Sequence, residues 1–190
     1  MNRRLISGAA VFGAFAAIGP SFVGDAHADQ KDPRLPALFD ALKAAPTSGA
    51  ATAIEHRIWG IWFESGDGEI DKLMAIGAVA MSAEEFPAAL QAFTRVVELR
   101  PDFAEGWNRR ATLYYVMGEY QKSLEDIERA LALEPRHFGA LSGLGLVNLQ
   151  LDREAAAAKA YQRVLDIDPQ SESARQSLDT INALLKRKSI

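Results

Sequence analysis

Between residues 70 and 171, mostly apolar and small side chains recur at positions i, i+4 and i+7, which places them on one face of a helix. Each of three consecutive segments carries two such stripes. The first stripes are Leu73, Gly77 and Ala80, then Trp107, Ala111 and Tyr114, then Leu141, Gly145 and Asn148. The second stripes are Ala89, Phe93 and Val96, then Ser123, Ile127 and Ala130, then Ala157, Tyr161 and Val164. The pattern predicts three pairs of helices.

Three prolines mark the period of this region. Pro101, Pro135 and Pro169 stand 34 residues apart, and each follows a similar apolar and acidic phrase. Proline cannot continue a helix, so each one ends a helix and begins the turn to the next unit. The period divides the region into units at residues 70–103, 104–137 and 138–171.

Small residues recur where the two helices of a unit are expected to cross. The pairs are Gly77 with Ala89, Ala111 with Ser123, and Gly145 with Ala157. Small side chains let antiparallel helices approach closely, and the large apolar residues around them fill the remaining space. A short turn such as residues 118–120 joins the two helices of a unit.

With this period and these residues, the region resembles the tetratricopeptide repeat family. The residues that match the family's sequence pattern are Gly77, Ala89, Phe93 and Pro101 in the first unit, Trp107, Tyr114, Ala130 and Pro135 in the second, and Leu144, Gly145, Ala157 and Pro169 in the third. Arg110 and Asn148 depart from the pattern, since an apolar residue and an aromatic residue are usual there, and we expect them to weaken local packing. The resemblance implies an all-α fold, a right-handed superhelical solenoid of helical hairpins.

The resemblance also implies a function, because the first helices of such repeats line a concave face that holds peptides or partner helices. The lining implied here includes Met74, Ala78, Met81, Asn108, Arg109, Thr112, Tyr115, Ser142, Leu146 and Gln150. A subclass that clamps a carboxylate uses Lys and Asn at six of these places, where this chain offers only Asn108, so we exclude that activity. Arg109 and Tyr115 are the best anchor candidates, since interface hot spots favour these residue types. The alternative is simple solvent exposure.

Residues 29–69 are expected to form a polar leader and a helical hairpin over about 34–45 and 48–65, at best a degenerate fourth repeat. Its second helix carries an aromatic stripe that includes Trp59 and Trp62. An apolar stripe at helical spacing usually faces a core, so we expect it to pack against the first full repeat. The alternative hypothesis is a binding surface that drives formation of a homodimer.

Residues 172–190 are expected to hold a capping helix and a tail. Ser171 can cap a helix that reaches about Lys188, with an apolar face that includes Leu178 and Ile181. Such a helix shields the last face of a solenoid. The basic residues 186–188 complement the helix dipole, and a small basic contact patch is the alternative.

Residues 1–28 have the three parts of a secretory signal peptide. Arg3 and Arg4 form a positive start, an uncharged apolar stretch follows over 5–19, and residues 26–28 read Ala-His-Ala. We expect cleavage after Ala28 and a periplasmic protein, with secretion, an uncleaved anchor and the twin-arginine route as alternatives.

Composition and charge point away from catalysis. The net charge of −4 gives no basic footprint for nucleic acid, and the absence of cysteine removes thiolate chemistry and lipidation. Beyond the signal segment only His56 and His137 remain as histidines, and no catalytic set, metal site or cofactor loop is recognisable. We therefore predict no enzyme activity, no metal and no cofactor. The expected function is a scaffold or adaptor for an unidentified protein or peptide, without stable membrane insertion.

Overall fold

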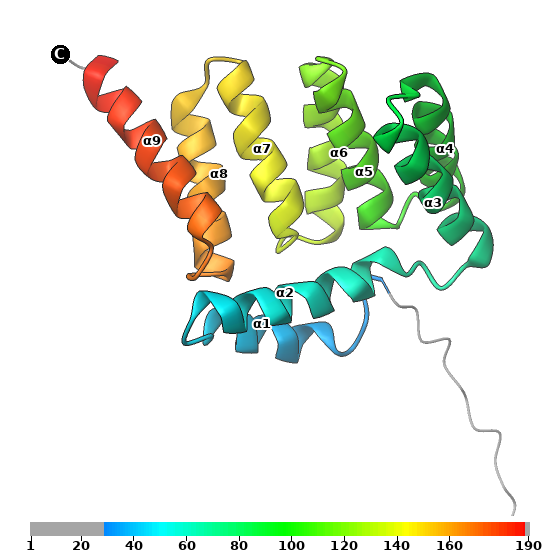
Figure 1. Cartoon of the computed structure of the whole chain (residues 1–190), viewed down its shortest axis with the longest axis horizontal. Coiled ribbons are helices and arrows are strands. Elements are labelled where there is room, and N and C mark those ends of the chain that lie inside the picture. The colour runs from blue at the N-terminus through cyan, green and yellow to red at the C-terminus, as the bar shows by residue number, and fades with distance from the viewer. Residues whose placement is uncertain (1–28, 189–190) are drawn as a thin grey trace, which may run out of the picture.

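A computed structural model describes residues 29–188, so the predicted signal segment lies outside the described residues. Those residues form nine helices and no strand (Figure 1). The helices are α1 (Leu35–Lys43), α2 (Ser48–Phe63), α3 (Gly68–Ser82), α4 (Phe86–Leu99), α5 (Ala104–Val116), α6 (Tyr120–Leu133), α7 (Phe138–Gln150), α8 (Glu154–Ile167) and α9 (Glu172–Lys188). No helix among the described residues is long and apolar enough to cross a membrane.

The paired helices α3/α4, α5/α6 and α7/α8 stack side by side as a helical solenoid (Figure 1). Each pair is joined by a tight turn with one residue in the left-handed backbone region. These residues are Glu84 (φ 59°), Gly118 (φ 76°) and Asp152 (φ 55°), spaced by the same period as the prolines. Glycine adopts this region without strain. In two of the three turns a residue with a side chain, Glu84 or Asp152, takes up this conformation at some cost in free energy.

The predicted small residues do lie where the helices of a pair cross. A Cβ atom on Gly77 would stand 2.5 Å from the Phe93 ring, and one on Gly145 would stand 2.5 Å from the Tyr161 ring. The small residue therefore makes room for an aromatic side chain of the partner helix. In the middle pair, the Ser123 hydroxyl donates to the Ala111 carbonyl at 2.8 Å.

The expected weakness at Arg110 is offset by a partly buried ion pair. Its Nε and Nη2 atoms donate to the two carboxylate oxygens of Asp126 at 2.7 and 2.9 Å. The guanidinium also lies 5.0 Å from the centre of the Trp107 ring. This fork-to-fork geometry and the hydrogen bonds to Asp126 raise the pKa of Arg110 above its ordinary value. At the other departure, Asn148 donates to the Leu144 carbonyl at 2.8 Å.

Helix α9 covers the outer face of α8 at the C-terminal end of the solenoid (Figure 1). Its inward residues Ala174 and Ile181 are 2% and 1% exposed and belong to a core cluster with Tyr161 and Val164. The remaining face of the helix is mostly polar, as expected at a solenoid end, with Leu184 39% exposed.

The N-terminal hairpin does not stack on α3 as a degenerate fourth repeat, so that expectation is wrong. Residues 29–65, here called the strap, run across the ends of the repeat helices (Figure 1). The strap lies against the turns that join one repeat to the next. Arg136 stacks over the Phe39 ring at 4.1 Å in one turn, and Gln170 donates to the Ala45 carbonyl at 3.2 Å in the next.

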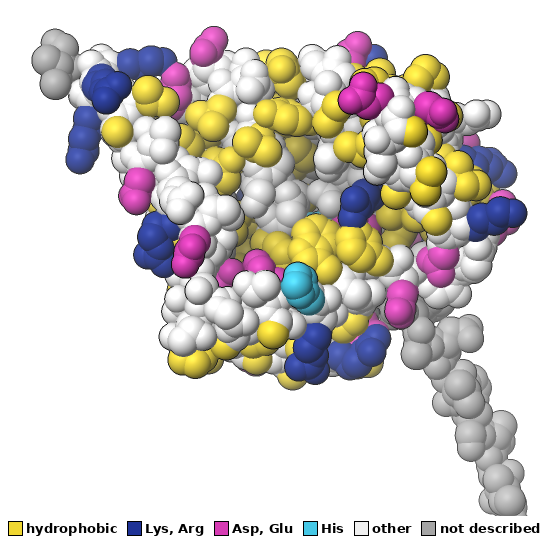
Figure 2. All heavy atoms as spheres, viewed as in Figure 1, with side chains coloured by type: hydrophobic (Ala, Val, Ile, Leu, Met, Phe, Trp, Pro, Cys, Tyr) yellow, Lys and Arg dark blue, Asp and Glu magenta, His cyan; other side chains and the backbone are white. Residues whose placement is uncertain are grey.

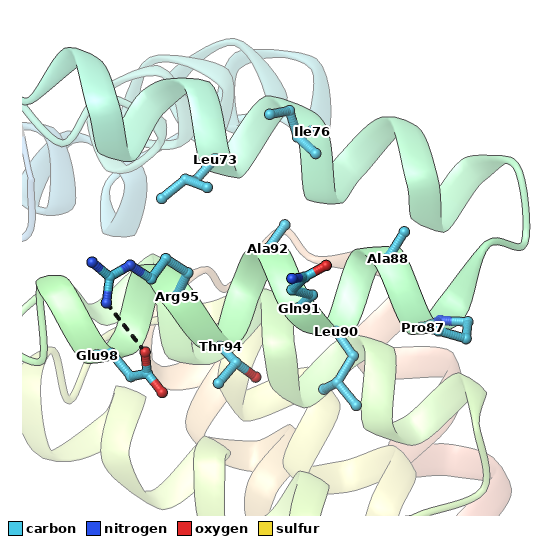
Figure 3. A pocket seen from close by; sticks show the side chains of 10 residues that line it. All are labelled: Leu73, Ile76, Pro87, Ala88, Leu90, Gln91, Ala92, Thr94, Arg95 and Glu98. Carbon is cyan, nitrogen blue, oxygen red and sulfur yellow. Dashed lines mark hydrogen bonds and ion pairs between the residues drawn. The ribbon is translucent and has the colours of Figure 1, made fainter.

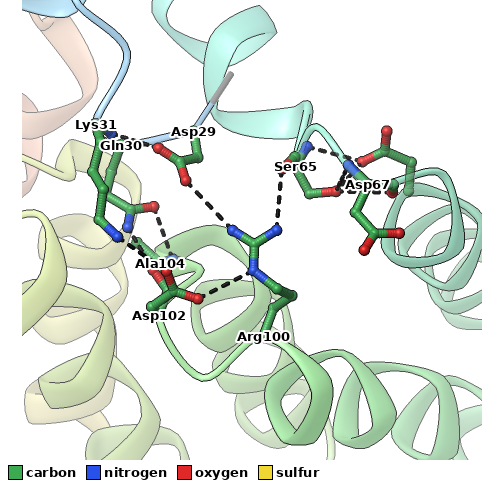
Figure 4. A network of polar contacts seen from close by, with 9 residues as sticks. Asp29, Gln30, Lys31, Ser65, Asp67, Arg100, Asp102 and Ala104 are labelled. Carbon is green, nitrogen blue, oxygen red and sulfur yellow. Dashed lines mark hydrogen bonds and ion pairs between the residues drawn. The ribbon is translucent and has the colours of Figure 1, made fainter. Parts of the chain in front are cut away.

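A polar network fastens the first of these turns to both ends of the strap (Figure 4). The Arg100 guanidinium lies 3.6 Å from the Asp29 carboxylate and donates to the Ser65 carbonyl at 3.3 Å. Gln30 accepts from the Ala104 amide at 3.2 Å and donates to the Asp102 carbonyl. Asp29 and Gln30 are 1% and 8% exposed, so the leader is part of the fold.

The aromatic stripe of α2 packs against the start of α7 and not against the first full repeat. Trp62 is 1% exposed and stacks on His137, with ring centres 4.1 Å apart and an interplanar angle of 13°. Trp59 meets Phe138 edge to face at 5.3 Å. The prediction of a degenerate fourth repeat was wrong because the strap runs back along the solenoid instead of extending it.

Candidate functional site

The first helices of the repeats face a hollow that the strap closes from below (Figure 2). Hydrophobic side chains gather in this hollow between the strap and the repeat helices (Figure 2). Two adjoining cavities lie on this face and share Leu146. One of about 230 Å³ is formed by α5, α6 and α7, and one of about 380 Å³ is formed by α7, α8 and α9. We call the two cavities together the concave groove.

Five of the residues predicted to line the concave face do line the groove. They are Asn108, Thr112, Tyr115, Ser142 and Leu146. Leu146 is 41% exposed, which is unusual for a large apolar side chain at a helix centre. Gln150, also predicted, reaches the Tyr115 hydroxyl at 3.5 Å. Met74 lies elsewhere, because it is 8% exposed in the core of the first repeat, and Met81 packs half-buried against the same core.

A buried carboxylate holds the two most polar of the predicted residues. Glu105 is 1% exposed and accepts from Asn108 Nδ2 at 2.8 Å and from Arg109 Nε at 2.6 Å. His137 Nε2 lies 3.0 Å from the same carboxylate. Since His137 Nδ1 accepts from the Ala140 amide, the proton on Nε2 is the one donated to Glu105. Glu105 thus ties α5 to the start of α7.

The same network reaches the aromatic face of α2. His137 stacks on Trp62, while the Arg109 guanidinium lies 4.6 Å above the Phe63 ring. Phe63 is 42% exposed and Arg109 keeps about a third of its side chain accessible at 30%. Arg109 is therefore held in place by Glu105, next to an exposed aromatic ring.

Gly139, on the wall of the groove, fixes how closely the strap approaches. A Cβ atom at Gly139 would stand 2.5 Å from Trp59 Cη2 and 2.9 Å from Cζ2. The residue also lines the smaller cavity. The indole of Trp59 can therefore reach the groove wall only because this position has no side chain.

Replacing Gly139 by alanine is expected to push the Trp59 ring away and to lower the free energy of unfolding by about 1–3 kcal/mol. The matched control is Gly60→Ala in α2, where an added Cβ meets nothing within 4 Å. That control should raise stability by about 0.5–1 kcal/mol, because alanine favours helix more than glycine does. Chemical denaturation followed by circular dichroism compares the two. Equal effects of the two variants would contradict the contact.

A pair of carboxylates lies where the strap meets the turn between α8 and α9. Glu55 of α2 faces Asp168, which is 2% exposed, beside a cavity of about 350 Å³. Burial, the charge of Asp168 and a hydrogen bond to Asp168 raise the pKa of Glu55 from 4.5 to about 7. The protonated Glu55 donates to Asp168, so one proton is shared across the contact.

This pair predicts a stability that falls as the pH rises. The folded chain holds the Glu55 proton more tightly than the unfolded chain does. The contribution of protonated Glu55 to the free energy of unfolding is therefore lost between pH 4.5 and about 7, and it does not change above that range. Glu55→Gln should therefore raise the melting temperature at pH 8 and lose this advantage toward pH 4.5. Glu128→Gln, at an exposed position of α6, is the control. Parallel pH profiles for Glu55→Gln and the wild type would refute the shared proton.

Residues 29–188 contain no group of three or more His, Cys, Asp or Glu side chains placed to hold a metal ion. His56 lies exposed on α2, and His137 is fully buried in the network described above. The groove and its surroundings present an exposed leucine, hydroxyl and amide groups, and one arginine beside an aromatic ring.

Comparison with known sequences identifies the repeats. A family model described as tetratricopeptide repeat matches residues 74–122 and 108–172. A TPR repeat-containing protein of Rhizobium etli is 40% identical over 148 residues, which are 78% of this chain and 72% of that protein. The small glutamine-rich tetratricopeptide repeat-containing protein 2 of Mycosarcoma maydis is 30% identical over 108 residues, 57% of this chain and 31% of that protein.

Solved structures show the same fold. The Sgt2 TPR domain from Aspergillus fumigatus superposes with a TM-score of 0.62 at 26% identity, covering 65% of this chain and 83% of that one. The first TPR of Spaghetti (RPAP3), solved bound to an HSP90 peptide, gives a TM-score of 0.60 at 23% identity. It covers 62% of this chain and 94% of that one.

Proposed function

Because the chain belongs to the tetratricopeptide repeat family, we propose that it is a non-enzymatic adaptor that holds a segment of a partner protein in its concave groove. The observation that carries the proposal is the groove itself, where Leu146 lies exposed between two cavities on the face that the first helices line. The RPAP3 repeat of the same fold holds a peptide, which supports a peptide-binding role here. The matching family model describes a repeat and no enzyme activity.

The groove selects the chemistry of its partner. Leu146 and Phe63 offer apolar surface for one or two apolar side chains. The Tyr115 hydroxyl accepts a long contact from Gln150, which leaves the tyrosine proton for an acceptor on the partner. A short segment with an apolar anchor and backbone carbonyl groups fits these features. A free carboxylate is not the expected anchor, because of the six places that a carboxylate clamp would use only Asn108 could serve, and Glu105 already occupies it.

Partner capture tests the groove. We expect Tyr115→Ala combined with Leu146→Asp to lose at least about 90% of the partner recovered by the wild-type chain, since hot-spot residues carry most binding energy. Val116→Asp is the control, because Val116 is a 49% exposed apolar residue that lines neither cavity. Recovered proteins are quantified by mass spectrometry, and circular dichroism checks that each variant is folded. Unchanged recovery with the double variant would reject the groove as the binding site.

We also propose that the protein acts in the periplasm, with secretion as the alternative. The support is the signal-like sequence of residues 1–28. Intact mass of the protein recovered from the periplasmic fraction tests this, and a chain that still begins at Met1 would overturn it.

A homodimer through the aromatic helix has little physical support. Trp62 is 1% exposed, and Trp59 packs against Trp62, Phe63 and Phe138 of the same chain. The side chains that this alternative needs at a surface are therefore already used to dock the strap.

A further inference from the structure

The N-terminal end of the solenoid lacks a neighbour. Val79 of α3 is 71% exposed, whereas Leu113 and Val147, which hold the same position one and two repeats later, are both 0% exposed. Leu113 is buried in the core of the first repeat and Val147 in the core of the second. The preceding repeat thus covers this position wherever one exists, and Val79 keeps an apolar side chain where none is described.

A groove lined by residues of α3 and α4 lies at the same end of the molecule (Figure 3). Its volume is about 720 Å³, the largest of the cavities described above. Leu73 and Ile76 extend from α3 toward Ala88 and Ala92 on α4 (Figure 3). Ile76 is 46% exposed, so α3 presents a second exposed apolar side chain one turn before Val79. A solenoid end that stays in water is normally polar.

No described helix of the chain covers this groove. The strap, which precedes α3 in sequence, docks along the turns instead, and α9 is packed on α8 at the opposite end. Most exposed positions of α9 are polar, among them Arg175, Gln176 and Asp179, and Leu184 is 39% exposed near its C-terminal end. Stacking of one molecule's C-terminal end onto another's N-terminal end would therefore bury several polar side chains against apolar residues, which is unfavourable.

We propose that the α3–α4 end is a dimer interface, at which a second copy of this chain packs with the same surface about a two-fold axis. An interface of this kind must be complementary to itself. Along α4 the groove carries one cation and one anion, Arg95 and Glu98, which contact each other at only 3.5 Å with more than half of each side chain exposed. Antiparallel packing of two α4 helices sets each Arg95 beside the Glu98 of the other copy. Ile76 and Val79 are buried at the centre.

The proposal concerns a surface separate from the concave groove and goes beyond the proposed function. It leaves both concave grooves of the pair accessible, so a dimer would present two partner-binding sites. Loss of the dimer and loss of partner binding are therefore distinguishable with different variants.

Light scattering of the protein, isolated in the form that cells accumulate, tests the interface. At roughly 50 µM the wild type is expected to have twice the mass of one chain, and Val79→Lys to have the mass of one chain. Val79 is mostly exposed, so the variant should fold, and circular dichroism checks this. Val116→Lys, at another exposed valine, is expected to remain a dimer and to show that an added charge alone does not dissociate it.

Charge reversal separates this geometry from other contacts. Arg95→Glu or Glu98→Arg alone places like charges across the two-fold axis and should weaken the dimer at least about tenfold. The double variant Arg95→Glu with Glu98→Arg exchanges the charges and should restore it. A monomeric wild type, a dimer unaffected by Val79→Lys, or a mass that keeps rising with concentration would each overturn the two-fold interface.

Discussion

Replacing Trp62 by alanine is expected to lower the free energy of unfolding by about 3–5 kcal/mol. The side chain is 1% exposed and contacts Phe39, His137 and Phe138, so its removal opens a cavity between the strap and the start of α7. Chemical denaturation followed by circular dichroism measures the loss. A change of less than about 1 kcal/mol would show that the strap is not held by this contact.

Trp62→Phe is the informative companion. The indole Nε1 of Trp62 is buried without a hydrogen-bond partner. Phenylalanine loses part of the ring volume but also removes this unsatisfied donor, whose burial is itself unfavourable. We therefore expect Trp62→Phe to cost less than about 1.5 kcal/mol. A cost as large as that of alanine would mean that the full indole shape, and not burial of an aromatic ring, secures the strap.

Replacing Glu105 by alanine is expected to cost a similar amount, about 3–5 kcal/mol, because it removes one member of a buried charged network. Three groups then lose their acceptor: Asn108 Nδ2, Arg109 Nε and His137 Nε2. Arg109 can turn toward water, since its side chain is 30% exposed, but His137 is fully buried and cannot. Denaturant titration at neutral pH measures the effect.

Glu105→Gln separates the charge from the shape. Glutamine keeps the volume, but its amide nitrogen is a donor and would face either the Arg109 donor at the Oε1 position or the Asn108 and His137 donors at the Oε2 position. We expect an intermediate cost of about 1–3 kcal/mol. Exposed Glu128→Gln should change stability by less than about 0.5 kcal/mol. A glutamine variant as stable as the wild type would show that these hydrogen bonds contribute little to the fold.

The repeat region was predictable because its information is local and periodic. The spacing of Pro101, Pro135 and Pro169 gives the register, and the small residues at Gly77 and Gly145 give the helix crossings. The helix crossings depend on residues within one repeat, and the proline spacing is a regular sequence period that needs no knowledge of tertiary contacts. The family comparison confirms the repeat family and the helical solenoid.

The position of the strap was not predictable from the same signals. It depends on contacts between residues far apart in sequence, such as Gln30 with Asp102 and Ala45 with Gln170. One sequence signal was available: Gly139 stands in the first turn of a helix, where the earlier repeats have Asp71 and Glu105. A glycine at such a position indicates that another part of the chain approaches closely.

The candidate site was predicted in part. The resemblance to the repeat family placed Thr112, Tyr115 and Leu146 on the concave face, and these residues line the groove. It did not predict that Asn108 and Arg109 are held by Glu105, since glutamate is rarely buried and a sequence pattern assigns it to the surface. Whether these residues contact a partner remains a prediction for the capture experiment.

The strap has a mechanical consequence for the solenoid. Repeats that contact only their neighbours can bend and stretch through small rotations at each junction. Here one segment is fastened to all three junction turns, through Arg100, Arg136 and Gln170. That edge of the array cannot lengthen without breaking these contacts, so the curvature of the concave face is set before any ligand arrives. A partner segment must match a groove of fixed width, and binding loses correspondingly little conformational entropy of the receptor.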